Sequence, residues 1–236
     1  MLAITALTVR FGGIVALDDV AFDVAPGTIT GLIGPNGAGK TTCFNCITRL
    51  YTPTSGSIAY CGDDLLRLRP HEIVRHGIAR TFQNVALFAQ LSVADNLLVG
   101  AHVRGLGAHD AHAQAQEILA YLGLAEIAQV RVAGLAYGTR KTIELARVLM
   151  AKPRLILLDE PAAGLGHGEI DALAIRIEDI RRRFDVTILM VEHHMGLVMR
   201  VCDRIVVLDS GRKIADGTPA QIRDDRSVIE AYLGVA

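Results

Sequence analysis

Apolar and polar residues alternate along two stretches at the start of the chain, around positions 4–9 and 20–24. A repeat of two residues is typical of β-strands that bury one face. The Pro26-Gly27 pair follows the second stretch and marks a turn. The pattern therefore predicts two half-buried strands before residue 26, paired antiparallel.

Short apolar runs alternate with amphipathic segments along much of the remaining chain. The apolar runs predict strands at Ile29–Ile33, Ser57–Tyr60, Ile78–Phe82, Leu155–Leu158, Thr187–Val191 and Ile205–Leu208. The amphipathic segments predict helices at Thr41–Arg49, Pro70–His76, His109–Leu122, Thr139–Met150, Glu169–Phe184 and His194–Cys202. Strands that alternate with helices predict an α/β fold with a mostly parallel sheet.

Residues 91–150 interrupt this alternation, because they contain several helical signals and few strand signals. The sequence Ser92-Val93-Ala94-Asp95 resembles a capping box and predicts the start of a helix. The sequence Thr218-Pro219-Ala220-Gln221 predicts the start of another helix, with proline at the first helical position. We expect one domain over residues 1–236, with a helical subdomain inserted at about residues 84–150.

The composition narrows the class of protein. The 236 residues are 51% hydrophobic and 21% charged, which is enough apolar material for a large core and excludes disorder. A formal charge of −1 gives no electrostatic reason to bind nucleic acid. No apolar run approaches the roughly 18–20 residues that cross a bilayer, and the start lacks signal-peptide features. We therefore expect a soluble chain that stays where it is made.

Four cysteines are too few for a disulfide scaffold. Cys43 and Cys46 have the C-x-x-C spacing of a redox or zinc site. They lie within a predicted helix and no second pair follows, which favours two buried, reduced thiols.

A glycine-rich segment after the strand at residues 29–33 carries the sharpest chemical signal. It matches the G-x-x-x-x-G-K-T pattern of a phosphate-binding loop and reads Gly34-Pro35-Asn36-Gly37-Ala38-Gly39-Lys40-Thr41. Backbone N–H groups up to Thr42 would face phosphate oxygens at the positive end of the following helix. Lys40 would reach the β- and γ-phosphates, and the Thr41 hydroxyl would bind Mg²⁺. The alternative is a glycine-rich turn, which the strand–loop–helix setting disfavours.

Two acids follow the apolar strand at residues 155–158. The end of a buried parallel strand lies at the sheet edge where ligands bind, which places Asp159 and Glu160 near the loop. We expect Asp159 to hold Mg²⁺ through water and Glu160 to act as a general base on the attacking water.

Several further motifs occur in a familiar order. Gln83 follows Arg-Thr-Phe, His193 follows Val-Glu, and Phe11 ends the first predicted strand. Before the strand that leads to Asp159, the sequence reads Leu135-Ala136-Tyr137-Gly138. With the loop and the acids, these resemble the ATP-binding subunit of ABC transporters over essentially the whole chain. The resemblance implies the ABC ATPase fold, a P-loop NTPase core with an antiparallel β subdomain and a helical insert, and it implies ATP and Mg²⁺.

The resemblance also implies roles that the residues alone do not establish. Gln83 would bind the metal and assist catalysis, His193 would be the switch histidine, and Phe11 would stack on adenine. Taken alone, a histidine after a strand is usually a surface or packed residue, and a phenylalanine there is usually core. The segment Leu135–Gly138 would be the signature motif, which caps the γ-phosphate held by a second ATPase subunit.

Three positions depart from the family pattern. Ala136 replaces the usual signature serine, Thr139 replaces a glutamine, and Gly166 replaces an acidic or amide residue. They leave phosphate and metal ligation untouched and affect only the expected contacts between subunits.

Other features resemble the branched-chain amino-acid importer subgroup. They are Ala162-Ala163-Gly164-Leu165, Glu192-His193-His194-Met195 and the tail Ala231-Tyr232-Leu233-Gly234. This subgroup implies integral-membrane permeases, a second ABC ATPase in a homo- or heterodimer, and an indirect link to an external solute-binding protein. It implies a cytoplasmic subunit, peripheral on the inner face of the bacterial cell membrane, and no nucleic-acid partner.

Alternatives stay open at this point. Related importers carry urea, amides or aromatic acids, and lipid-exporter ATPases have similar size and tails. A non-transport ATPase is disfavoured because the chain has no sustained heptads and only one ATPase unit. An apolar strip that could dock a permease helix, or could be ordinary core, comprises Val85, Leu87, Phe88, Leu91 and Leu97.

Overall fold

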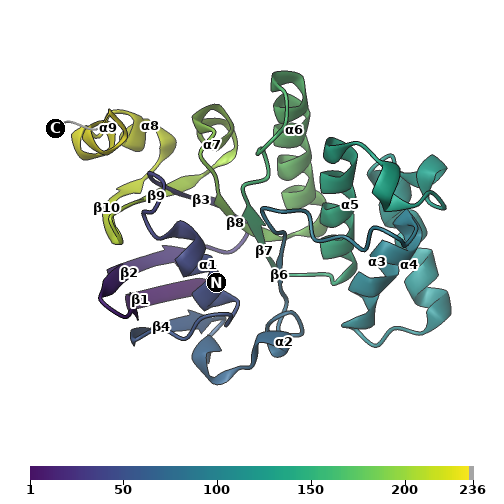
Figure 1. Cartoon of the computed structure of the whole chain (residues 1–236), viewed down its shortest axis with the longest axis horizontal. Helices are drawn as coiled ribbons and strands as arrows, with labels where there is room; N and C mark the ends of the chain where they lie inside the picture. Colours follow the sequence, from purple (N-terminus) through teal and green to yellow (C-terminus); the bar gives the residue numbers. More distant parts are fainter. Residues whose placement is uncertain (234–236) are drawn as a thin grey trace.

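The protein, described by a computed structural model over residues 1–233, contains two β-sheets with helices around them (Figure 1). The smaller sheet has four antiparallel strands in the order β2-β1-β4-β5. They are β1 (Leu2–Phe11), β2 (Ile14–Val24), β4 (Ser55–Tyr60) and β5 (Asp63–Asp64). The expected antiparallel pair at the start of the chain is therefore present.

The larger sheet has six strands in the order β10-β9-β3-β8-β7-β6. All neighbours are parallel except β10 and β9. The strands are β3 (Ile29–Ile33), β6 (Ile78–Arg80), β7 (Leu155–Asp159), β8 (Thr187–Val191), β9 (Arg204–Asp209) and β10 (Arg212–Gly217). This mixture of one antiparallel and one mostly parallel sheet confirms the predicted fold class.

The helices lie close to their expected positions. They are α1 (Lys40–Ile47), α2 (Pro70–Ile73), α3 (Val93–His102), α4 (Ala108–Tyr121), α5 (Tyr137–Met150), α6 (His167–Phe184), α7 (Met195–Val201), α8 (Pro219–Arg223) and α9 (Arg226–Leu233). Short 3₁₀ turns occupy Leu65–Arg67, Ala125–Ile127 and Val132–Gly134. The Ser92 hydroxyl accepts from the Asp95 N–H, and Thr218 forms a capping box with Gln221, as predicted.

Several helix boundaries differ from the prediction, and α9 was not predicted. Helix α1 ends at Ile47 rather than Arg49, and α6 begins at His167, two residues earlier than expected. Helix α2 ends at Ile73 rather than His76, shortly before Gly77 takes a left-handed φ of +91°. Helix α5 begins at Tyr137, two residues earlier than expected, so Gly138 is its second residue rather than the residue before it. Gly234, the last residue of the tail motif, lies outside the described residues.

Each face of the six-stranded sheet packs into its own core. On β7, Leu155 and Leu157 join α1 and the four-stranded sheet, whereas Ile156 and Leu158 face a core that includes α5 and α6. This alternation follows from the two-residue period of a strand. Helix α1 therefore lies on one side of the sheet, and the α3–α5 region packs with the other side (Figure 1).

Within residues 1–233, no helix combines the length and the apolar character that a bilayer crossing requires. Cys43 and Cys46 are free and buried inside α1, which confirms the interpretation of this pair as packed thiols.

Candidate functional site

The glycine-rich loop connects β3 to α1 at the carboxyl end of the parallel strands. Two of its glycines are required by their surroundings. A Cβ on Gly34 would lie 2.0 Å from the Leu208 carbonyl oxygen, and a Cβ on Gly39 would lie 2.6 Å from the Ala16 carbonyl oxygen. Both have positive φ, +148° and +100°. The loop is thus wedged between β9 and the β1–β2 hairpin, with the first N–H groups of α1 facing outward from the helix end.

Lys40 begins α1 and turns its side chain back over the loop. Its Nζ donates hydrogen bonds to the carbonyl oxygens of Gly34, at 2.7 Å, and Pro35, at 2.8 Å. Burial lowers the pKa of Lys40, and the negative charge of Glu160 opposes that shift. The ammonium therefore sits partly desolvated beside N–H donors, which is a favourable place for a phosphate.

Asp159 ends β7 as a buried carboxylate paired with Arg80 of β6. The Arg80 Nη2 lies 2.7 Å from Asp159 Oδ2, and Nη1 donates to Asn45 of α1 at 2.7 Å. The guanidinium also lies over the rings of Phe44 and Phe82. Arg80 thus joins the helix of the phosphate loop to the acidic strand. No local sequence pattern pointed to this residue.

Glu160 follows in a left-handed conformation, with φ of +46°. Its N–H donates to the Val191 carbonyl oxygen at 2.9 Å, which ties the turn to β8. The Gln83 Nε2 donates to Glu160 Oε2 at 2.8 Å, and the His193 Nδ1 lies 3.9 Å from the same oxygen. The structure therefore brings together three residues from three separate segments.

Glu192 is a second residue that the sequence analysis did not assign. Its side chain is fully buried, and it accepts from the N–H groups of Ala162, His193 and His194 at 2.7–2.8 Å. One carboxylate thus organises both the turn after Glu160 and the segment that carries His193. The acid that directly precedes His193 was the available signal in the sequence.

Phe11 lies at the tip of the β1–β2 hairpin, 45% exposed, with its ring edge-on to Tyr51 at 5.2 Å between centroids. The same hairpin presents the Ala16 carbonyl to Gly39 of the loop. An exposed aromatic beside the phosphate loop leaves a face available for a flat ligand.

The segment Leu135–Gly138 leads into α5, with Ala136 as the residue before the helix. Tyr137 packs on Gly164, where a Cβ would lie 3.0 Å from the ring, and Gly138 packs against Glu169 of α6. Helices α1 and α5 pack into different hydrophobic cores, so the phosphate loop and the segment Leu135–Gly138 lie in different parts of the chain's fold. The departing residue Gly166 precedes α6, and its N–H donates to Glu169 Oε2 at 2.8 Å.

The apolar strip beyond Gln83 has two kinds of member. Leu97 is fully buried in the core, whereas Phe88 is 51% exposed and Leu91 is 38% exposed. Val85 and Leu87 are half-buried. Only part of the strip is therefore ordinary core.

The donor set near the loop fits Mg²⁺ held mainly by nucleotide phosphates. Thr41, Asp159 and Gln83 each offer oxygen, the atom that this ion prefers. No cluster of three or more His, Cys, Asp or Glu side chains among residues 1–233 could hold a metal unaided. One carboxylate and two neutral oxygens beside a triphosphate match the usual Mg²⁺ arrangement, in which one or two carboxylates bind the ion together with substrate phosphates.

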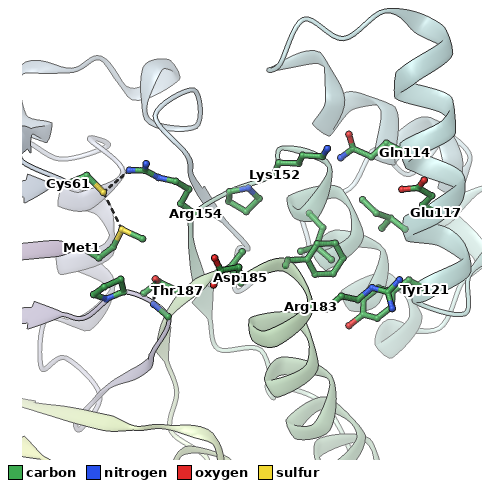
Figure 2. Close-up of a pocket in the computed structure, with 17 residues that line it drawn as sticks. Met1, Cys61, Gln114, Glu117, Tyr121, Lys152, Arg154, Arg183, Asp185 and Thr187 are labelled. Atoms are coloured by element: carbon green, nitrogen blue, oxygen red, sulfur yellow. Dashed lines mark hydrogen bonds between the residues drawn. The ribbon is translucent and has the colours of Figure 1, made fainter.

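A large cavity of about 850 Å³ lies elsewhere and is not part of this site (Figure 2). Arg154 and Thr187, which line it, are at the beginnings of β7 and β8, the opposite edge from the loop. Figure 2 shows Cys61 between Arg154 and Met1, with Tyr121 and Arg183 across the cavity.

Comparison with known proteins supplies the family context. Residues 17–163 match the family described as ABC transporter, and residues 212–236 match that described as branched-chain amino acid ATP-binding cassette transporter. The chain is 43% identical to the high-affinity branched-chain amino acid transport ATP-binding protein BraF of Pseudomonas aeruginosa and 42% identical to LivG of Escherichia coli K12. Each alignment covers 100% of this chain and 98% of the relative. A solved structure of the ADP conformation of an ABC transporter ATP-binding cassette superimposes with a TM-score of 0.90 at 29% identity, covering 100% of this chain and 99% of that one.

Proposed function

This chain belongs to the ABC transporter family, and we propose that it is the ATP-hydrolysing subunit of an importer for branched-chain amino acids. The substrate class rests on the match of the tail and on two relatives described as branched-chain amino acid transport ATP-binding proteins. Those matches favour this importer over the lipid-exporter and urea, amide or aromatic-acid readings.

The observation that carries the hydrolytic role is the convergence of Lys40, Glu160 and Gln83 at one edge of the sheet. The N–H groups of residues 34 and 36–42 and the Lys40 ammonium would hold the β- and γ-phosphates. Thr41, Asp159 and Gln83 would hold Mg²⁺, which neutralises charge on the transferred phosphoryl group when bound. The Phe11 ring would stack on adenine.

Glu160 would accept a proton from the water that attacks the γ-phosphorus. Gln83 already donates to this carboxylate, and the exposed ring of His193 stands beside it, where it can contact the γ-phosphate. Loss of that phosphate removes charge from the centre of these contacts, which is the usual logic of a nucleotide switch.

The segment Leu135–Gly138 would bind the nucleotide of a second ATPase subunit. Its helix α5 presents N–H groups and a positive dipole end, which favour an anion. Integral-membrane permeases would dock on the exposed part of the strip, around Phe88 and Leu91. The chain would then sit on the inner face of the bacterial cell membrane, and an external binding protein would select the solute.

The test of hydrolysis is Glu160→Gln in the purified full chain with Mg²⁺ and ATP. We expect nucleotide affinity within about threefold of wild type, loss of most hydrolysis, and a nucleotide-bound dimer on gel filtration. Glu117→Gln, an exposed change on α4, is the control and should hydrolyse ATP normally. Normal hydrolysis by Glu160→Gln would remove the assigned base.

The test of the transport role is affinity isolation from membranes, followed by uptake of labelled leucine, isoleucine and valine into vesicles. We expect permeases and a second ATPase to co-purify. The Phe88→Glu variant should lose the permeases while its ATP affinity stays unchanged. Co-purification of ribosomes or nucleic acid instead would contradict the importer.

A further inference from the structure

Lys141 reaches from the signature helix to the turn that holds the proposed base. It lies in the second turn of α5, one residue before Thr142. Its Nζ donates to the carbonyl oxygen of Glu160 at 2.8 Å and to that of Pro161 at 3.1 Å. The contact therefore joins α5 directly to the turn that carries Glu160.

The turn that Lys141 contacts has a strained backbone. Glu160 has a φ of +46°, which a residue with a Cβ adopts only when its surroundings hold it there. The Glu160 N–H is bound by Val191 O, and the Ala162 N–H is bound by Glu192 Oε1 at 2.8 Å. These two contacts fix the donors of the turn from the β8 side. Lys141 binds the carbonyl oxygens of the turn from the α5 side.

The surroundings of the ammonium are strongly acidic. Burial lowers the pKa of Lys141, and the carboxylates of Glu192, Glu144, Glu160 and Asp159 all oppose that shift. The ammonium also lies near the Tyr137 ring, with Nζ 5.4 Å from the centroid. A charged donor in this partly buried place makes stronger hydrogen bonds to carbonyls than a neutral donor would.

We propose that Lys141 is a positioning residue that holds the Glu160 carboxylate in place and couples the signature helix to it. The inference rests on the proposed role of Glu160 in hydrolysis. Tyr137 and Gly138 begin the same helix. A nucleotide that the second subunit holds against this end of α5 would therefore move the helix as one rigid element. A shift of α5 reaches Glu160 through Lys141.

The experiment compares Lys141→Met with Lys141→Arg in the purified full chain. Methionine keeps the length of the side chain and removes the donor, whereas arginine keeps a charged donor for two carbonyls. We expect kcat to fall roughly 10- to 100-fold in Lys141→Met, with ATP affinity within twofold of wild type. Lys141→Arg should recover at least a third of the wild-type kcat.

Arg176→Met is the matched control, because Arg176 also anchors α5, through a 2.9 Å hydrogen bond to the Thr142 hydroxyl, but does not bond to the Glu160 turn. It should keep kcat within twofold of wild type. An equal loss of kcat in Arg176→Met and Lys141→Met, or wild-type kcat in Lys141→Met, would overturn the proposal.

The Glu160→Gln variant distinguishes a failure of the Lys141 proposal from a failure of the proposed role of Glu160 in ATP hydrolysis. If Glu160→Gln hydrolyses ATP normally, the assigned base is wrong whatever Lys141 does. If Glu160→Gln is inactive, adding Lys141→Met should lower its residual rate by less than twofold, since both changes act on one group. A further tenfold loss in the double variant would assign Lys141 a separate role.

Discussion

Arg80 and Asp159 form an ion pair inside the protein, with Arg80 Nη2 2.7 Å from Asp159 Oδ2 and neither side chain more than 6% exposed. The same guanidinium donates to Asn45 and Thr48 of the α1 region. One side chain therefore sets the distance between the phosphate-loop helix and the acidic strand. Asp159 Oδ1 takes no part in this ion pair.

Arg80→Met should strongly destabilise the protein, because it leaves the Asp159 carboxylate buried without a partner. Breaking a buried pair in this way costs about 3–5 kcal/mol of unfolding free energy. Urea unfolding of the full chain measures it. Arg200→Met removes an equally short pair with Asp171, at 2.6 Å, from the surface and should cost less than about 1 kcal/mol. Equal losses of unfolding free energy in the two variants would show that burial does not increase the contribution of the Arg80–Asp159 pair to stability.

The chemistry of the site could be predicted wherever it is local in sequence. The loop at Gly34–Thr41 and the acids after β7 each consist of neighbouring residues whose spacing carries the meaning. Arg80 could not be predicted in this way, since it meets Asp159 across 79 positions and only after β6 and β7 pair. Lys141 was missed for the same reason, since it meets the Glu160 turn across 19 positions, whereas the role of Glu192 depends on its burial, which the local pattern does not show.

The fold shows a similar division. Buried strands such as β7 and β8 were located to within one residue, because their apolar runs are unbroken. The edge strands β5 and β10 are polar and lack that signal, so the pattern did not reveal them. The order that places β3 between β8 and β9 depends on packing of distant segments, which no local pattern encodes.

Lys40→Ala should weaken ATP binding without unfolding the protein. The Lys40 ammonium bonds to two carbonyl oxygens of its own loop, so the fold loses little. Hydrogen bonds to charged groups contribute about 1.5–3 kcal/mol, which predicts a roughly 10- to 100-fold loss of affinity. Titration with a fluorescent ATP analogue measures it. Lys213→Ala on β10 serves as the control, and unchanged affinity in Lys40→Ala would refute the phosphate loop.

Gly34→Ala should disrupt the loop itself. Its Cβ would lie 2.0 Å from the Leu208 carbonyl oxygen, so β9 or the loop must move. The left-handed φ adds strain of about 1–3 kcal/mol. We expect a lower unfolding midpoint together with weaker nucleotide binding. Gly134→Ala meets no atom within 4 Å and should leave both quantities unchanged. If the Gly34→Ala variant kept the wild-type unfolding midpoint, the conclusion that position 34 has no room for a Cβ would be wrong.

The four cysteines should differ sharply in reactivity, and the difference follows from burial. Cys61 is exposed, whereas Cys43, Cys46 and Cys202 are buried. Burial raises the pKa of Cys46 to about 11 and that of Cys202 to about 12, and it raises the pKa of Cys43 as well. Because the thiolate is the nucleophile, these three thiols are protected at pH 8 both by access and by protonation.

Iodoacetamide at pH 8 should therefore add one label to the native chain, at Cys61, and four labels after denaturation. Mass spectrometry of the intact protein counts them. Cys61→Ser should remove the native label and leave three after denaturation. Rapid native labelling of Cys43 or Cys46 would mean that α1 opens often enough to expose its inner face. In that case the phosphate loop that begins this helix could not be the preorganised anion site that the nucleotide proposal requires.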